Sequence, residues 1–164
     1  MSIVVSDTSP LHYLIQCEAV HLLPALFQGV LIPPAVFREL QHSRTPATVR
    51  AWAQALPPWI KVQSPRVVDS EINADEGERE AISLACEIGA SAILMDDRKG
   101  RAEASRFGLR VTGTLGLLEI AAIRGLIDLP KVMGLLQKTN ARLDPELIQS
   151  VMRRADRTNP GTSS

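Results

Sequence analysis

Acidic residues follow two short apolar segments of this 164-residue chain, at the point where each segment ends. Asp7 follows residues 3–6, and Asp96 and Asp97 follow residues 92–95. If both segments are parallel neighbours in one sheet, these acids converge at the edge where α/β proteins bind ligands. Carboxylates gathered in this way repel one another, and a hard divalent cation such as Mg²⁺ removes that conflict. The pattern therefore predicts metal-assisted chemistry, and phosphodiester hydrolysis suits such a residue set.

Two acids in predicted helices can reach the same crevice. Glu39 lies in a helix predicted over residues 35–41, directly after the second strand. Glu78 lies in the first turns of a helix predicted over residues 74–88. At about 100° per residue, Glu78 projects from the side of that helix that also carries Ile82. An acid on an apolar helix face is a cap, an ion-pair partner or a functional group.

Each acid also has an ordinary structural interpretation. Asp7 and the pair Asp96 and Asp97 could cap the helices that follow them. Glu78 could complement the dipole of its helix, and Glu39 could be a solvated surface residue. These alternatives weaken when the acids are taken together, because both strand ends and both helix acids can reach one crevice.

Several other kinds of site find no support in the sequence. There is no GxxxxGK[ST] phosphate loop, no GxGxxG turn after the first strand and no G-x-S-x-G nucleophile elbow. The histidines His12, His21 and His42 are scattered, and Cys17 and Cys86 stand alone, so zinc and disulfides are not expected. We expect both cysteines to be buried as small hydrophobic residues.

Composition favours a globular chain that is not strongly basic. Hydrophobic residues make up 45%, and 18 Lys and Arg balance 18 Asp and Glu. Contact with nucleic acid must therefore come through a bound metal or a local basic patch, for which Arg98, Lys99 and Arg101 are the candidates. A solvated helix face is the alternative for that run.

No apolar run is long enough to span a membrane and the first residues do not resemble a signal peptide, so we expect a cytoplasmic protein.

Short apolar strands that alternate with helices predict an α/β fold with a central, mainly parallel sheet. Apolar spacing, glycines and prolines place strands at residues 3–5, 30–32, 59–62, 92–95 and 109–111, and helices at 11–17, 20–27, 35–41, 45–56, 74–88, 98–107, 115–123, 130–137 and 145–154. We expect one domain over residues 1–156, a C-terminal helical pair within 130–154, and a flexible tail at 157–164.

Four motifs, in order and spacing, resemble the PIN-domain family. They are Ser6-Asp7-Thr8-Ser9-Pro10-Leu11, Gly77-Glu78-Arg79-Glu80-Ala81-Ile82-Ser83-Leu84-Ala85, Ile93-Leu94-Met95-Asp96-Asp97-Arg98 and Val111-Thr112-Gly113-Thr114-Leu115-Gly116-Leu117-Leu118. The last of these, together with Leu143-Asp144-Pro145-Glu146-Leu147-Ile148, is similar to a prokaryotic subgroup related to VapC-type toxin ribonucleases. The similarity covers about residues 3 to 156.

The resemblance implies a PIN-like three-layer α/β/α sandwich that uses Mg²⁺ or Mn²⁺ to cleave single-stranded RNA. It also implies a toxin–antitoxin setting with a small antitoxin as partner. By position, Asp7, Glu39, Glu78 and Asp96 match the catalytic acids of the family, and many relatives have Asp in place of Glu78. Asp7, Glu78 and Asp96 would hold the metal, and Asp97 would assist or replace Asp96.

Two other functions compete with this interpretation. One is a catalytically silent PIN-fold module that binds RNA or a partner, with acids that serve only structure. The other is a receiver-like phosphoacceptor domain, which would place an acid pair after the first strand, whereas here the pair comes late.

We also expect a homodimer, to which the apolar positions of residues 130–154 contribute. Packing of those positions on the parent domain is the alternative.

Overall fold

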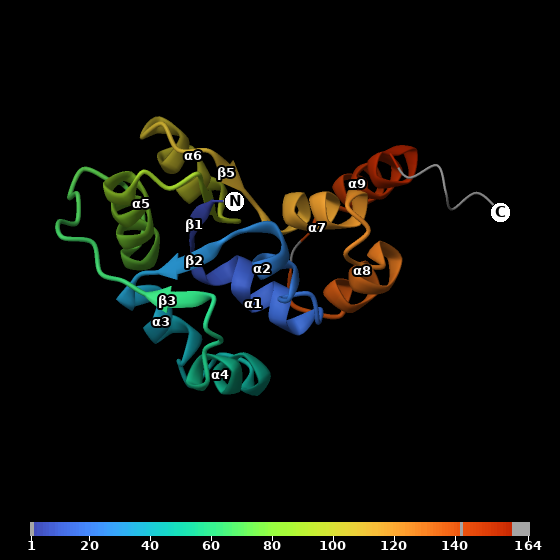
Figure 1. The fold of residues 1–164 in the computed structure, drawn as a ribbon, viewed down its shortest axis with the longest axis horizontal. Helices are drawn as coiled ribbons and strands as arrows, with labels where there is room; N and C mark the ends of the chain where they lie inside the picture. The colour runs from blue at the N-terminus through green and yellow to red at the C-terminus, as the bar shows by residue number, and fades with distance from the viewer. Residues whose placement is uncertain (1, 142, 159–164) are drawn as a thin grey trace.

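Five short parallel strands form the central sheet in a computed structural model, which describes residues 2–141 and 143–158 (Figure 1). The strands are β1 (Ile3–Ser6), β2 (Gly29–Ile32), β3 (Ile60–Val62), β4 (Ala92–Leu94) and β5 (Val111–Thr112). Their order across the sheet is β3-β2-β1-β4-β5, and every neighbouring pair is parallel. The predicted α/β class with a parallel sheet is confirmed.

Helices connect and cover the strands. They are α1 (Thr8–Gln16), α2 (Leu22–Leu26), α3 (Pro34–Leu40), α4 (Ala47–Gln54), α5 (Glu76–Ile88), α6 (Arg98–Arg106), α7 (Thr114–Ile123), α8 (Leu129–Gln137) and α9 (Pro145–Thr158). α3 begins with Pro34, whose fixed φ suits a first helical turn. α5 ends at Gly89, which takes the left-handed conformation (φ 62°) that closes many helices.

Side chains along the central strands point alternately to the two faces of the sheet, and this divides the interior into two apolar layers. Val4 of β1 packs into a core shared with helices α1, α4 and α7, whereas Val5 packs into a second core beneath α5 and α6. Ala92 and Ile93 of β4 divide in the same way. This period-two division places helices on both faces of the sheet, as a three-layer sandwich requires.

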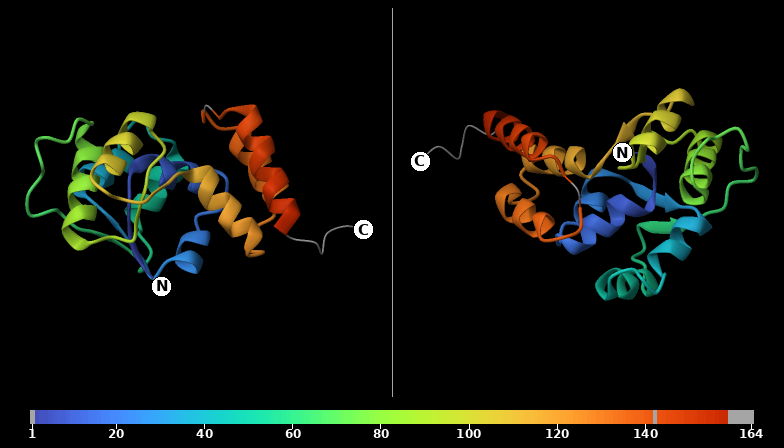
Figure 2. Two further views of the ribbon diagram at one scale, coloured as in Figure 1. Left: turned by 90° about the horizontal axis from the view of Figure 1, so that it is seen from above. Right: turned by 180° about the vertical axis from the view of Figure 1, so that it is seen from behind.

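The C-terminal helices form the end of the molecule that lies furthest from α5 (Figures 1 and 2). α9 packs against α7, and Arg154 donates hydrogen bonds to Glu119 at 2.7 and 3.3 Å. Ile148 and Val151 of α9 are buried against the same chain, while Leu147 is 47% exposed. Packing within the chain therefore uses most of the apolar positions that suggested an intermolecular contact.

α9 continues to Thr158, so the first two residues of the predicted tail are helical, and residues 159–164 lie outside the described part of the chain. No helix within the described ranges is both long and apolar enough to cross a bilayer. Cys17 is buried as predicted. The prediction for Cys86 was wrong: this side chain is exposed, on the outer side of α5.

Candidate active site

The two strand ends that carry acids are neighbours at the point where the chain reverses its path across the sheet. From β1 the chain runs outward to β2 and β3, and β4 then pairs with the opposite side of β1. Ser6 lies opposite Leu94 in the register, and the Asp7 amide donates a hydrogen bond to the Leu94 carbonyl at 2.9 Å. Asp7 and Asp96 thus emerge side by side at the switch point, where open α/β sheets form their binding crevice.

Asp7 is a buried carboxylate that does not cap the helix it precedes. It occupies the N-cap position of α1, yet its side chain makes no capping hydrogen bond, so the capping interpretation does not account for it. Asp7 is only 6% exposed. Burial raises the pKa of Asp7 to about 7, a backbone hydrogen bond at Thr8 opposes this rise, and the charges of Asp75, Glu39 and Asp96 add to it.

The N-terminus of α5 brings two more acids to the crevice. Asp75 caps the helix by accepting a hydrogen bond from the Glu78 amide at 2.8 Å. Glu78 is buried, and burial followed by the charges of Asp75 and Asp7 raises its pKa to about 8. The guanidinium of Arg79 donates to the carbonyls of Ile72 and Ala74 at 3.1 and 2.9 Å, which fixes the loop that leads into this cap.

The two acids after β4 have different roles in the structure. Asp97 caps α6 by accepting a hydrogen bond from the Gly100 amide at 2.8 Å. Asp96 instead accepts two hydrogen bonds from Thr114, one from its amide and one from its hydroxyl, each at 2.7 Å. Burial raises the pKa of Asp96, while the bonds from Thr114 and the charge of Arg101 oppose that rise. Asp97 thus caps α6 while its charge also raises the pKa of Glu78, and Asp96 is fixed by the start of α7.

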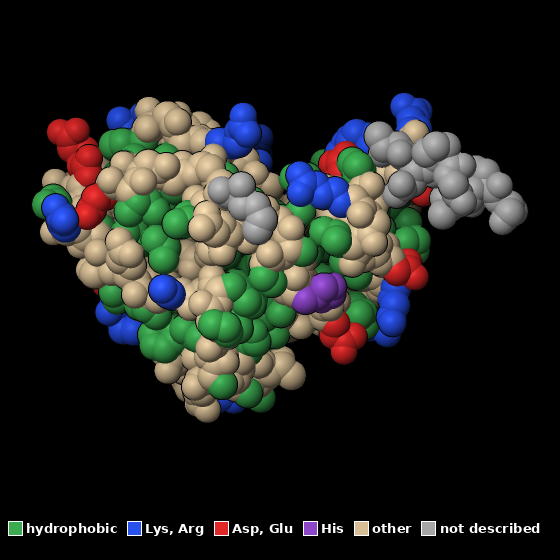
Figure 3. Space-filling model, viewed as in Figure 1, with side chains coloured by type: hydrophobic (Ala, Val, Ile, Leu, Met, Phe, Trp, Pro, Cys, Tyr) green, Lys and Arg blue, Asp and Glu red, His purple; other side chains and the backbone are tan. Residues whose placement is uncertain are grey.

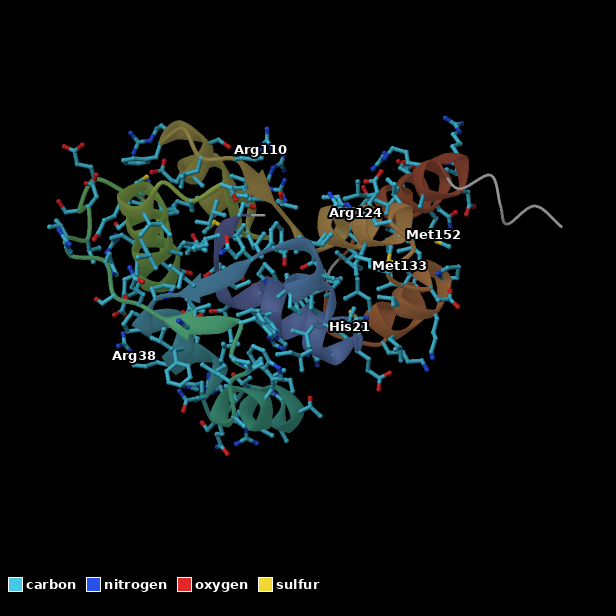
Figure 4. The ribbon with its side chains drawn as sticks, viewed as in Figure 1. His21, Arg38, Arg110, Arg124, Met133 and Met152 are labelled. Carbon is cyan, nitrogen blue, oxygen red and sulfur yellow. The ribbon has the colours of Figure 1, made fainter. Side chains whose placement is uncertain are left out.

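Glu39 lies at the exposed rim of the crevice. The hydroxyl of Thr8 donates a hydrogen bond to it at 2.5 Å, which joins the start of α1 to α3. Arg38 next to it pairs with Glu76 at 2.8 Å, and Figure 4 shows Arg38 on the outer side of α3. The amide of Ala35 donates to Glu80 at 3.3 Å. α3 is therefore held against α5, and Glu39 stays near the buried acids.

Two glycines in helices leave the space that the carboxylates occupy. A Cβ on Gly77 would lie 3.0 Å from Glu39 Oε1 and 3.6 Å from Asp7 Oδ1, so both carboxylates approach the same point. A Cβ on Gly100 would lie 2.7 Å from Glu78 Oε2, a distance that real Cβ atoms do not show. Any larger residue at position 100 would have to displace Glu78.

The predicted basic run lies on α6, beside the acids. A Cβ on Gly113 would lie 2.9 Å from Asp96 Oδ1 and 2.5 Å from Arg101 Nη1, so this glycine lets the guanidinium approach the carboxylate. Arg98 and Arg101 line a groove that begins at the acids. Lys99 is exposed on α6 and does not contribute to that lining. The structure therefore brings two of the three predicted basic residues to the site.

The groove has a volume of about 1110 Å³ and runs from Asp96 and Asp97 to the C-terminal helices. Its walls come from α1, α6, α7 and α9 and from the segment between α8 and α9. In Figure 3 the surface is indented between the main body and the C-terminal helices. The acids thus stand at one end of an elongated depression that can admit a chain molecule.

The donor set suits a divalent cation. Within residues 2–141 and 143–158, no three His, Cys, Asp or Glu side chains form a preassembled metal cage. Mg²⁺ does not require one, because it keeps several waters and uses one or two carboxylates. Burial raises the pKa values of Asp7 and Glu78, and the charges of neighbouring carboxylates raise them further. A hard cation is the partner that such oxygen ligands fit.

Two side chains at the site, those of Asp75 and Thr114, were not among the predicted functional residues. Asp75 adds charge beside both Asp7 and Glu78. The sequence does indicate a role for Asp75, because an Asp three residues before a Glu at the start of a helix is a capping pattern. The bond from Thr114 to Asp96 depends on tertiary contact between β4 and the start of α7, so local pattern could not reveal it.

Comparison with known proteins gives one match that covers nearly the whole chain. The family model described as PIN domain matches residues 3–157. No curated protein matches the chain. The matched range includes all five strands and the acids described above.

Proposed function

The chain belongs to the PIN-domain family, whose members are generally nucleases, and on this premise we propose that it is a metal-dependent endoribonuclease. The proposed reaction is hydrolysis of phosphodiester bonds in RNA. The single observation that carries the proposal is the convergence of Asp7, Glu78 and Asp96 at the sheet switch point, with the pKa values of all three raised.

In this proposal Asp7, Glu78 and Asp96 hold Mg²⁺ or Mn²⁺, and Asp97 assists while it caps α6. Such a cation supplies activation of a water and stabilisation of negative charge on the phosphate oxygens. Glu39, at the exposed rim and fixed by Thr8, orients the attacking water.

Proton competition sets the expected pH dependence. The pKa of Asp7 is raised to about 7 and that of Glu78 to about 8, so both carry protons in the cation-free protein below those values. A metal must displace these protons, because it binds ionised carboxylates. We therefore expect cleavage to weaken as the pH falls through this range.

The test is cleavage of a labelled single-stranded RNA with Mg²⁺, with Mn²⁺ and with EDTA. Asp7→Asn should lower the cation-dependent rate by more than about a hundredfold, because even outer partners of metal ligands cost about 10- to 100-fold. Asp128→Asn is the matched control, since Asp128 only caps α8 on the surface. Equal cation-dependent rates for the wild-type chain and Asp7→Asn would contradict the proposal.

A catalytically silent module that binds RNA or a partner is the second candidate. The hydrogen bonds that Asp96 and Asp97 accept from Thr114 and Gly100 favour it, because they give both acids a structural role. On this alternative, RNA binding would be the same with and without Mn²⁺, and no cleavage would appear in either condition.

The toxin role is a further part of the proposal. A small antitoxin would block the acidic crevice, and a basic side chain that pairs with the carboxylates is the natural means. Expression of the wild-type chain alone should then arrest growth, whereas Asp7→Asn should not. Growth arrest by both chains would mean that toxicity does not depend on the proposed cleavage.

We also propose a homodimer, on the evidence of α7. This helix is mostly apolar, with Glu119 as its one charged residue, yet Ile120 and Ile123 are each 38% exposed. A second copy would cover them. Light scattering of the wild-type chain and of Ile123→Asp should show a dimer and a monomer, respectively, and a monomeric wild-type chain would contradict the proposal.

A further inference from the structure

Tyr13 lies in the groove that leads away from the acids. It is the only tyrosine of the chain and, among the described residues that line the groove, the only aromatic one. Its ring is partly buried and stacks on His12, with centroids 5.4 Å apart and an interplanar angle of 22°. Tyr13 and Asp96 line the same groove. Burial and then the charge of Asp96 raise the pKa of Tyr13.

The groove is lined by groups of three kinds. Arg98 and Arg101 follow Asp97 along α6 and supply positive charge for a phosphate backbone. Leu143 and Leu147 supply apolar wall, and Asn140 supplies an amide that can form hydrogen bonds. A nucleotide presents the matching three characters in its phosphate, its base face and its base edge.

We propose that the groove is a nucleotide subsite in which the ring of Tyr13 stacks on a base next to the phosphate held at the acids. The subsite rests on the proposal that RNA is the substrate, and it adds the side chains that would position this RNA. Stacking is available only to an unpaired base, so the subsite selects single-stranded RNA over a duplex. The volume of about 1110 Å³ exceeds an ordinary small-ligand pocket and accommodates more than one nucleotide.

Binding without cleavage tests the subsite directly. Fluorescence anisotropy of a short labelled single-stranded RNA, measured in EDTA, gives the affinity of the wild-type chain, Tyr13→Ala and Tyr13→Phe. Tyr13→Ala should weaken binding by about 5- to 100-fold, and Tyr13→Phe should stay within about twofold of wild type, because stacking requires only the ring. Val67→Ala is the control, since Val67 is 75% exposed and lies outside the groove.

Abasic nucleotides test the subsite in the wild-type chain itself, where no substitution disturbs folding. At one position of the RNA, removal of the base should weaken binding to the wild-type chain by about the factor lost in Tyr13→Ala. In Tyr13→Ala the same removal should have no further effect. Equal penalties in both chains, or wild-type affinity in Tyr13→Ala, would overturn the subsite.

Failure of the subsite and failure of the proposed function give different results. A wild-type chain that cleaves RNA with Mn²⁺ but shows no base-dependent binding would refute the subsite alone. A wild-type chain that neither binds nor cleaves RNA would refute both. If a peptide from a partner occupied the groove instead, Tyr13→Ala would leave RNA affinity unchanged, which also counts against the subsite.

Discussion

Replacement of Asp7 by asparagine should make the cation-free protein more stable at alkaline pH, although it removes a proposed metal ligand. Asp7 is buried, and its pKa is raised from 3.8 to about 7. An acid with a raised folded-state pKa stabilises the fold fully only below its unfolded pKa, and that stability is lost as the pH rises towards the folded value. Asparagine keeps the shape and cannot ionise.

The size of the effect follows from the pKa shift of Asp7. About three units, at about 1.4 kcal/mol per unit, give an upper bound of about 4 kcal/mol for the stability lost between acid and alkaline pH. Part of that loss has already occurred at about pH 5, above the unfolded pKa, so about 2 to 3 kcal/mol should separate about pH 5 from about pH 8.5.

Urea denaturation in EDTA measures this difference. The free energy of unfolding of Asp7→Asn, minus that of the wild-type chain, should rise with pH. Mn²⁺ at alkaline pH should stabilise the wild-type chain more than Asp7→Asn, because a cation that binds only the folded state adds stability by mass action. A difference between the Asp7→Asn and wild-type chains that does not change with pH would refute the reasoning from burial.

Two substitutions next to the acids should separate packing from electrostatics. Gly100→Ala places a Cβ 2.7 Å from Glu78 Oε2 and should cost about 1 to 3 kcal/mol by urea denaturation. Gly134→Ala, in α8, meets nothing within 4 Å and should stabilise by up to about 1 kcal/mol; effects of the same sign would contradict this contrast. Thr114→Val removes a hydroxyl bond that lowers the pKa of Asp96, so the pH profile of cation-dependent cleavage should move to higher pH. An unchanged midpoint would mean that Asp96 does not titrate in the reaction.

The strand ends were the most predictable part of the site. Val4 and Val5 lie in a β-branched run that ends at an acid, and a run buried on both faces is typical of a parallel sheet. Given parallel neighbours, Asp7 and Asp96 had to emerge at the same edge. Register between β1 and β4 follows from tertiary pairing, and no local pattern specifies it.

Helix boundaries and exposure were less predictable for physical reasons that can be named. α1 begins at Thr8, directly after Asp7, which the sequence already suggested as a possible cap, whereas its apolar spacing begins only at Leu11. α1 ends before Glu18, which takes a left-handed conformation (φ 58°) that apolar spacing does not reveal. Cys86 was predicted to be buried because cysteines usually are, yet helical spacing places it next to the buried face of α5, whose last residue is Ala85.

β1 is the first strand in the chain and also the middle strand of the sheet, with β4 as the neighbour that completes the acid cluster. During synthesis, at about 5–20 residues per second, several seconds separate the appearance of Asp7 from that of Asp96. Until β4 pairs with β1, the early carboxylate has no counterpart across the crevice. The cluster of acids is therefore a late product of synthesis, and a chain that ends before β4 cannot assemble it.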